Sequence, residues 1–324
     1  MYIDGKQLKK VLENASKEKY GIIAANYAAD VIARGIIQGG DFSKSDVIVQ
    51  ISYSSCKFAS GKKQDVYDGV RILCGIAKSI AKQYDVGVAL NIDHCKPEHV
   101  DWLKFIINAK LVSMVMMDAS ELPLDENIKI TKEIVKLAHK NDILVEGELG
   151  RIKGVEDEVK SKKVVYTDVD DAIKFVKETG VDLFAPAVGT SHGMTTEYKT
   201  EINVDLIKKL SDAFKKNKLD VGIVLHGSSA VSPTIQKRAV QAGVIKLNKD
   251  TTFQLEFAKA VQQYWKQNAD AVECPEDVKE EDFVPDKGRF DYRKWFRFGE
   301  EYVETSAIKL FDITGSRNKS LFKK

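Results

Sequence analysis

The sequence lacks the features that mark several large classes of protein. It has only four cysteines, Cys56, Cys74, Cys95 and Cys274, which are widely scattered and form no CxxC pair. This spacing argues against a disulfide framework and against a thiolate zinc site. No apolar run approaches the ~20 residues of a membrane span, and the N-terminal segment has no signal-peptide core. We therefore expect a cytoplasmic protein with no membrane partner.

The sequence also carries almost no net charge. Its 50 Lys and Arg residues against 48 Asp and Glu residues give a formal charge of +2. No electrostatic feature therefore indicates binding to nucleic acid, although local basic clusters could bind small anions. No GxGxxG motif follows the first apolar run, which disfavours a dinucleotide-binding domain.

Short apolar runs recur along the chain, with amphipathic segments between them. The runs cover residues 21–26, 47–52, 86–92, 113–117, 143–149, 183–189, 221–227 and 243–248. The intervening segments 125–140 and 168–180 have helical spacing, and Gly180 stands where a C-cap glycine would end the second helix. Strands this apolar are typical of a parallel sheet covered by helices on both faces, and eight βα units match a TIM barrel. A doubly wound open sheet is the main alternative.

We accordingly expect an α/β fold in which a (β/α)8 TIM barrel has an N-terminal helix and a C-terminal helical extension. The catalytic barrel is expected over residues 1–268. Residues 269–324 are expected to form the extension and to pack on the barrel or on a dimer partner. Segment 286–311 predicts an amphipathic helix carrying Trp295, Phe296 and Phe298, and such aromatic density needs a surface to bury against.

Histidines follow three of the expected strands. His94 comes after the third run, His192 after the sixth, and His226 at the end of the seventh, whereas His99 and His139 lie in expected surface helices. The carboxyl ends of barrel strands meet at one rim, where TIM barrels place their active sites. Three imidazoles around a cation with one open position are what a catalytic zinc site requires. The alternative is that each histidine caps or packs locally.

Carboxylates occur at the same level of the expected barrel. Asp93 precedes His94, and Asp118 follows the fourth run. Glu146 and Glu148 alternate in "LVEGELG", which places both on the same face of a strand. Two acids on one face of an otherwise apolar strand are costly without compensation. This pattern indicates a metal, or a second metal, at the rim.

Glycine and hydroxyl residues follow the last three expected strands. The segments are "VGTSHG" (188–193), "HGSSA" (226–230) and "LNKDTT" (247–252). Barrels commonly build phosphate sites at this place from backbone N–H groups, which glycine allows an anion to approach closely. Each segment alone could equally be an ordinary tight turn.

Taken together, these segments resemble the zinc-dependent class II ketose-bisphosphate aldolases, the family of fructose- and tagatose-bisphosphate aldolases. The resemblance is carried by "NIDHC", "DASELPLDENIKITKEIV", "VEGELGRIKGVEDE", "VGTSHG", "LHGSSAV" and "KLNKDT", in this order. It implies reversible cleavage of fructose 1,6-bisphosphate to dihydroxyacetone phosphate and glyceraldehyde 3-phosphate. Alternatives are a tagatose-bisphosphate or other ketose-phosphate aldolase, or a metal-binding barrel that binds sugar phosphates without cleaving them.

The resemblance also implies a role for each site residue. His94, His192 and His226 would bind the catalytic zinc, Asp118 and Glu148 a second divalent metal, and a monovalent cation would lie nearby. Asp93 would handle the proton of the C4 hydroxyl, and Glu156, in a loop, would exchange the C3 proton of the enediolate. Substrate and phosphate contacts are implied for Asn26, Ser52, Gly193, Lys199, Gly227, Ser229, Asn248, Asp250, Thr251 and Arg297.

Two further implications concern phosphates. The family usually has a lysine about four residues after the second histidine ligand, but Thr196 stands there, so Lys199 is expected to reach the C1 phosphate instead. The segment "FDYRKWFRFGEEYV" resembles that of the fructose-bisphosphate branch. In that branch the arginine corresponding to Arg297 crosses a homodimer interface to the C6 phosphate of the neighbouring site, and a guanidinium suits a phosphate because it is a bidentate donor.

Overall fold

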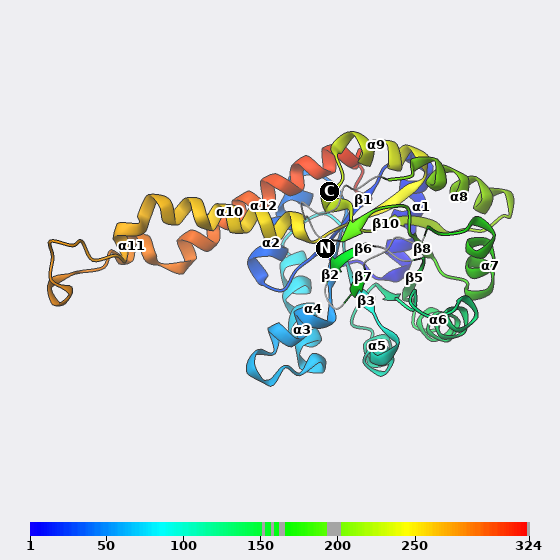
Figure 1. The fold of residues 1–324 in the computed structure, drawn as a ribbon, viewed down its shortest axis with the longest axis horizontal. Helices are drawn as coiled ribbons and strands as arrows, with labels where there is room; N and C mark the ends of the chain where they lie inside the picture. Colours follow the sequence, from blue (N-terminus) through cyan, green and yellow to red (C-terminus); the bar gives the residue numbers. More distant parts are fainter. Residues whose placement is uncertain (151–152, 157–158, 162–165, 193–201, 323–324) are drawn as a thin grey trace.

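Eight parallel strands form a closed barrel (Figure 1). The computed structural model describes residues 1–150, 153–156, 159–161, 166–192 and 202–322, with the backbone alone for 153–156, 159–161 and 191–192. The barrel strands are β1 (Ile22–Asn26), β2 (Val47–Ile51), β3 (Val88–Cys95), β4 (Met114–Met117), β5 (Leu144–Leu149), β8 (Leu183–Pro186), β10 (Gly222–Leu225) and β11 (Val244–Lys249). The eight expected strands and the TIM barrel are confirmed, and the doubly wound alternative is excluded.

Helices connect the strands and cover the outside of the barrel. They are α1 (Gly5–Glu18), α2 (Asp30–Ser43), α3 (Tyr53–Ala59), α4 (Val66–Ala81), α5 (Val100–Asn108), α6 (Leu124–His139), α7 (Val169–Thr179), α8 (Val204–Lys216), α9 (Pro233–Ala242), α10 (Thr251–Asn268), α11 (Lys287–Phe290) and α12 (Tyr292–Thr314). Helix α7 ends at the expected Gly180, which has φ 73°. No helix in the described ranges is long and apolar enough to cross a membrane.

The barrel interior changes from apolar to polar along the strands. Because successive side chains of a strand alternate between its faces, every second residue points inward. At the amino ends these residues are apolar, and they share one buried cluster with Leu8, Val11 and Leu12 of α1. Helix α1 therefore closes the amino end of the barrel. Further along, the inward residues are polar and buried, such as Gln50 and Asn91, so the polar site lies at the carboxyl end.

A small second sheet stands beside the carboxyl end of the barrel strands. It contains β6 (Lys153–Glu156), β7 (Val159–Ser161) and β9 (Ser191–His192), in the order β7-β6-β9. Strand β6 runs parallel to β9, with Gly154 opposite His192. This pairing places the backbone that carries Glu156 alongside the backbone that carries His192.

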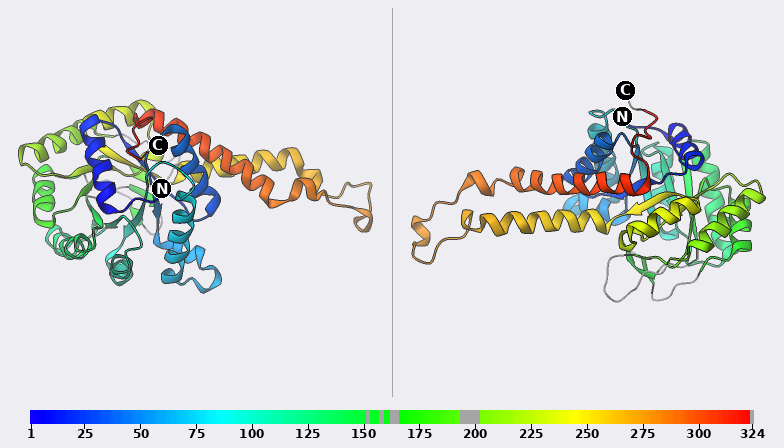
Figure 2. Two further views of the ribbon diagram at one scale, coloured as in Figure 1. Left: turned by 180° about the vertical axis from the view of Figure 1, so that it is seen from behind. Right: turned by 90° about the horizontal axis from the view of Figure 1, so that it is seen from above.

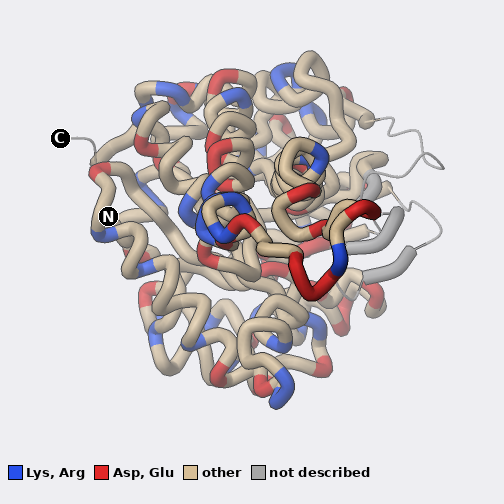
Figure 3. Tube along the Cα trace, turned by 90° about the vertical axis from the view of Figure 1, so that its left-hand side faces the viewer, with Lys and Arg blue, Asp and Glu red and all other residues tan. Residues whose placement is uncertain are grey.

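Helices α10 and α12 form an arm that extends away from the barrel (Figures 1 and 2). The second half of α12 returns to pack on α2, where Gly35 and Gly39 allow a close approach: a Cβ on Gly39 would lie 2.7 Å from Cβ of Ala307. Acidic residues gather in the loop at the tip of the arm (Figure 3). The expected helix with its aromatic residues is confirmed, whereas the division after residue 268, where α10 ends, stays a prediction.

Candidate active site

Asp93 and His94 both reach the interior of the barrel although they are neighbours on one strand. Strict alternation would turn one of them outward. The backbone of His94 has φ 45°, and the pairing of β3 with β4 shifts register between Ile92 and Cys95. A left-handed residue at a bulge redirects its side chain, and such strain is typical of functional sites. The two residues are 1% and 4% exposed.

The imidazoles of His94 and His226 face each other. Nε2 of His94 lies 2.9 Å from Nδ1 of His226. The other ring nitrogen of each is held by a carboxylate: Nδ1 of His94 lies 3.0 Å from Asp118, and Nε2 of His226 lies 2.7 Å from Glu146. Zinc-binding histidines characteristically turn one nitrogen to the metal and the other to a carboxylate. The two facing nitrogens therefore fit a zinc ion.

Burial and neighbouring charges shift the pKa values of three groups at this pair, His94, Asp118 and His226. Burial disfavours a charged His94, but Asp93, Asp118 and Glu148 together raise the pKa of His94 to about 10. Against its own burial, the contact with His94 lowers the pKa of Asp118 well below its usual range. Burial lowers the pKa of His226, and the hydrogen bond with Glu146 opposes this shift. Without a metal, the proton of this cluster therefore resides on His94.

Glu148 completes a second possible metal-binding group with His94 and Asp118. One ligand atom from each lies within 4.8 Å of the others. Glu148 is 2% exposed, and its Oε2 accepts no hydrogen bond within the described part of the chain. Burial, followed by the nearby Asp118, raises the pKa of Glu148 well above its usual value. A cation beside Glu148 would compensate both effects.

A chain of amide side chains holds Asp93 in place. Asn91 donates to Gln50, Gln50 donates to Asn26, and each of these hydrogen bonds is 2.8 Å long. Asn26 then donates to Oδ2 of Asp93 at 2.9 Å, while Asn248 donates to its Oδ1 at 3.2 Å. Each oxygen of Asp93 therefore has an amide donor, which fixes the plane of the carboxylate.

Lys246 and Glu146 form a buried ion pair next to His226 and Asn248. Nζ of Lys246 lies 2.8 Å from Oε2 of Glu146 and 2.7 Å from Oδ1 of Asn248. Both charged side chains are fully buried. Although burial opposes ionisation, Lys246 and the contact with His226 lower the pKa of Glu146 to about 2. Lys246 thus connects the carboxylate behind His226 with the amide that contacts Asp93.

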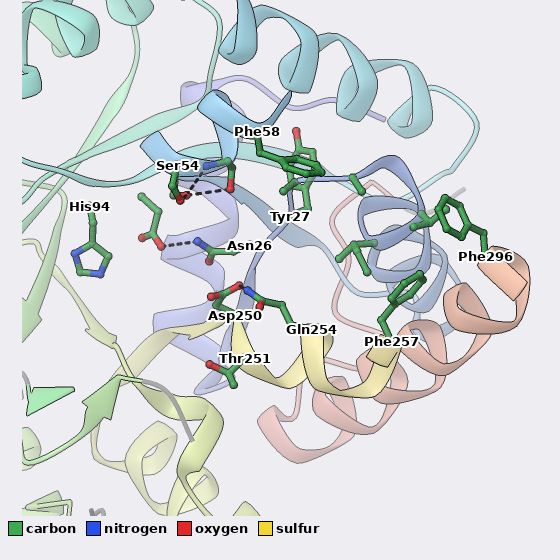
Figure 4. A pocket seen from close by; sticks show the side chains of 17 residues that line it. Asn26, Tyr27, Ser54, Phe58, His94, Asp250, Thr251, Gln254, Phe257 and Phe296 are labelled. Carbon is green, nitrogen blue, oxygen red and sulfur yellow. Dashed lines mark hydrogen bonds between the residues drawn. The ribbon is translucent and has the colours of Figure 1, made fainter. Parts of the chain in front are cut away.

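A pocket of about 650 Å³ opens beside Asp93 and His94 and extends toward the arm (Figure 4). Its site end is lined by Asn26, Ser52, Asp250 and Thr251, and its far end by Phe58, Phe257 and Phe296. No Lys or Arg is among its lining residues in the described part of the chain. The pocket is large enough for a sugar phosphate.

The remaining predicted residues lie in the turn after β10, on α12, or outside the described residues. Gly227, with φ 59°, and Ser229 lie in the turn after β10. Arg297 lies on α12, where it pairs with Glu300. The side chains of Glu156 and His192, and all of Gly193 and Lys199, lie outside the described residues.

The two other histidines have structural contacts away from the pair. His99 stacks on Tyr53 with ring centroids 3.6 Å apart, and His139 ends α6 beside Asp182 at 2.8 Å. His139 agrees with the expected surface position, while His99 is half-buried in a short 3-10 helix rather than exposed on an α-helix.

Sequence reasoning missed the roles of Gln50, Lys246 and Lys249. Their signal was available, because a polar residue inside an apolar strand is costly unless it has partners. What the sequence alone does not tell is which partners the barrel closure provides for them.

Comparisons with known proteins agree with this geometry. The model of the class-II fructose-bisphosphate aldolases matches residues 6–319. A fructose-bisphosphate aldolase of Helicobacter pylori is 29% identical over 96% of this chain and 98% of its own. A D-tagatose-1,6-bisphosphate aldolase subunit of Klebsiella oxytoca is 33% identical over 64% of this chain and 70% of its own. The crystal structure of a fructose-bisphosphate aldolase from Campylobacter jejuni superposes with a TM-score of 0.85 at 26% identity, covering 98% of this chain and 97% of that one. The chain therefore belongs to the class-II fructose-bisphosphate aldolase family, whose members depend on zinc.

Proposed function

We propose that this protein reversibly cleaves the C3–C4 bond of fructose 1,6-bisphosphate, giving dihydroxyacetone phosphate and glyceraldehyde 3-phosphate. The observation that carries the proposal is the convergence of His94 and His226 beside Asp93 at the head of a pocket. The two histidines supply a metal site, and Asp93, next to His94 in the chain, supplies a base. Retro-aldol cleavage needs both, because an electron pair must be accepted at one end of the bond and a hydroxyl proton removed at the other.

His94, His192 and His226 are the proposed ligands of the catalytic zinc. When bound, zinc acts as a Lewis acid toward the substrate carbonyl. The carboxylates of Asp118 and Glu146 orient the first and third ligands through their outer nitrogens. Asp118 and Glu148 are also the proposed contacts of a second divalent metal, and a monovalent cation is proposed close to the phosphate loops.

Asp93 is the proposed group that accepts the proton of the C4 hydroxyl. Its two amide donors, Asn26 and Asn248, leave the carboxylate oriented toward the pocket that it lines. Neither donor is charged, so Asp93 is not neutralised by a direct ion pair with them. The carboxylate can therefore accept a proton as the bond breaks and return it in the synthetic direction.

Glu156 is the proposed group that exchanges the C3 proton. The parallel pairing of β6 with β9 supports this role, because it brings the segment of Glu156 beside that of His192. Ser52, Gly193, Lys199, Gly227, Ser229, Asn248, Asp250 and Thr251 are the proposed contacts of the substrate hydroxyls and phosphates. Asp250 and Thr251 begin α10 directly below the pocket.

We also propose that the active unit is a homodimer. The pocket ends in phenylalanine side chains and has no cation among its described lining residues, whereas the C6 phosphate of a bisphosphate needs one. Arg297 of a second copy is the proposed source. The arm offers a surface for such a contact, because Tyr292 and Val284 on it are 62% and 84% exposed.

The reaction is tested with a coupled assay for triose phosphates on zinc-loaded protein, before and after removal of the metal with a chelator. Cleavage that is lost with zinc and restored by adding it back is expected. His94→Ala should abolish both zinc binding and cleavage, while His139→Ala, at a surface pair, should leave both unchanged. Zinc-loaded protein that cleaves no ketose phosphate would refute the proposal.

A second substrate, tagatose 1,6-bisphosphate, is favoured by one observation, the 33% identity to the Klebsiella oxytoca subunit. The two sugars differ only in configuration at C4, the carbon whose hydroxyl Asp93 is proposed to contact. Measuring kcat/KM for both bisphosphates and for the corresponding 1-phosphates decides between them. A higher value for fructose 1,6-bisphosphate is expected.

A further inference from the structure

Lys249 ends β11 with its side chain buried behind the loop that follows β10. It is 1% exposed. Its Nζ donates to the carbonyl oxygen of Ser228 at 2.7 Å, and Oγ of Ser228 donates to the carbonyl of Asn248 at 2.6 Å. The amine thus lies under the turn of Gly227 and Ser229, next to the start of α10 at Asp250.

The amine has no counter-charge. Within the described part of the chain, no carboxylate lies within ion-pair distance of Lys249, whereas Lys246, three residues earlier, contacts Glu146 at 2.8 Å. A buried ammonium with a single carbonyl acceptor is strongly disfavoured. Burial alone therefore lowers the pKa of Lys249 to about 7.

The charged groups on the flanking elements are engaged elsewhere. His226, which follows β10, contacts Glu146, and the carboxylate of Asp250 accepts from Gln254 on α10 at 2.6 Å. On β1, the residue opposite Lys249 is Ala25. The buried amine of Lys249 therefore lacks a counter-charge from these elements, and an anion bound from outside the chain would supply it.

We propose that Lys249 is a buried counter-charge for the phosphate group of the substrate, and that it takes up a proton when a phosphate dianion binds at residues 227–229 and 250–251. The inference rests on the proposed function, which places a phosphate in these loops. Lys249 acts through the Ser228 carbonyl and by its charge, so it is a positioning residue.

Proton uptake on binding provides the test, because a merely structural lysine would not change it. Calorimetric titration of zinc-loaded protein with dihydroxyacetone phosphate at pH 8, in two buffers of different ionisation enthalpy, gives the number of protons taken up. A lysine with a pKa near 7 is about one-tenth protonated at pH 8, so it can contribute up to about 0.9 proton. Uptake by the wild type should exceed that of Lys249→Met by roughly this amount.

The affinity for the phosphate should fall with the same substitution. Lys249→Met should bind dihydroxyacetone phosphate about tenfold more weakly or worse, because an anion then enters a buried site without its counter-charge. Binding of unphosphorylated dihydroxyacetone should be unchanged. Lys259→Met, which removes an exposed lysine of α10, serves as the matched control. Lys249→Gln provides a second neutral variant if the methionine variant does not fold.

Two results would overturn the assignment. One is equal proton uptake by the wild type and both neutral variants, which would leave Lys249 with a packing role only, whether or not binding weakens. The other is an unchanged affinity of the neutral variants for dihydroxyacetone phosphate. Cleavage is measured separately. A wild type that binds phosphate with the expected uptake but cleaves no ketose phosphate would refute the proposed reaction while leaving the role of Lys249 intact.

Discussion

His94 and His226 face each other across 2.9 Å through one ring nitrogen each, and a carboxylate holds each ring from behind. If both imidazoles were neutral and each donated its one N–H to its carboxylate, the two facing nitrogens would have no proton between them. The carboxylates around His94 resolve this by raising its pKa to about 10. Zinc and a proton therefore compete for the same place.

The first prediction follows from this competition. Zinc binding at pH 7.5 should release about one proton from His94, because the ion replaces it. The release should decline as the pH approaches 10, where His94 is already half deprotonated in the metal-free protein. Asp118→Asn should reduce the release and weaken zinc binding by roughly 10–100-fold. A pH-indicator dye in weakly buffered solution measures the release, and no release at pH 7.5 would contradict the role of His94.

The fold could be predicted from the sequence because its signal is local. Runs such as 86–92 are apolar enough to require burial on both faces, and eight such runs match a TIM barrel. The position of His94 beside Asp93 could be predicted only in part. That both side chains point inward depends on the positive φ of His94, a conformation that no residue type in the segment announces.

Partners across the barrel were beyond the sequence for a different reason. Lys246 and Glu146 are a hundred residues apart, and only closure of the strands brings them together. The arm is a similar case. Helix α10 follows β11 as the other helices follow their strands, and its own sequence does not indicate that it leaves the barrel surface to pack on α12.

The second prediction concerns Glu156. Glu156→Ala should lower kcat by the ~10²–10⁴ typical of a lost acid or base. Zinc content and the urea midpoint should stay unchanged, because the residue belongs to the small outer sheet and not to the barrel. Glu178→Ala, which removes an exposed carboxylate of α7, is the matched control. Unchanged turnover in Glu156→Ala would assign the proton transfer to another residue, with Asp157 or Glu158 the next candidates.

The third prediction concerns the buried ion pair. Lys246→Met should destabilise the protein by about 3–5 kcal/mol, because it leaves the Glu146 carboxylate buried with only His226 as a partner. Replacing both residues, as Glu146→Met with Lys246→Met, should recover much of the stability. The double variant should bind zinc more weakly than the wild type, because His226 then lacks its carboxylate. Urea unfolding and zinc titration measure the two effects, and a double variant no more stable than Lys246→Met would contradict the expected recovery.

The fourth prediction is a pH dependence of stability caused by Lys249. Its pKa is about 7 in the folded protein and ~10.4 in an unfolded chain. Between these values the unfolded chain binds more protons, so the free energy of unfolding should rise with pH, by at most ~1.4 kcal/mol per unit, and fall again on acidification. Lys249→Met should remove this contribution. Urea titrations of phosphate-free protein at pH 7, 8 and 9 measure it, and identical slopes for the two proteins would contradict it.

The last prediction concerns Arg297 and the dimer. Arg297 is 57% exposed and pairs with Glu300, a buried carboxylate that also contacts Arg34 at 2.8 Å. Because Arg34 remains as a partner, Arg297→Ala should cost less than about 1 kcal/mol of stability. Because the variant stays folded, a large change of its KM must come from a lost substrate contact.

If Arg297 reaches the C6 phosphate of the neighbouring site, Arg297→Ala should raise KM for fructose 1,6-bisphosphate about tenfold or more, the cost of a charge-assisted bidentate contact. KM for fructose 1-phosphate, which has no phosphate at C6, should hardly change. Arg293→Ala is the matched control, since Arg293 lies one turn earlier on α12 and pairs with Asp291. Light scattering at the assay concentration must show a dimer. A monomer, or equal changes of KM for both substrates, would remove Arg297 from the active site and leave the far end of the pocket to the aromatic side chains that line it.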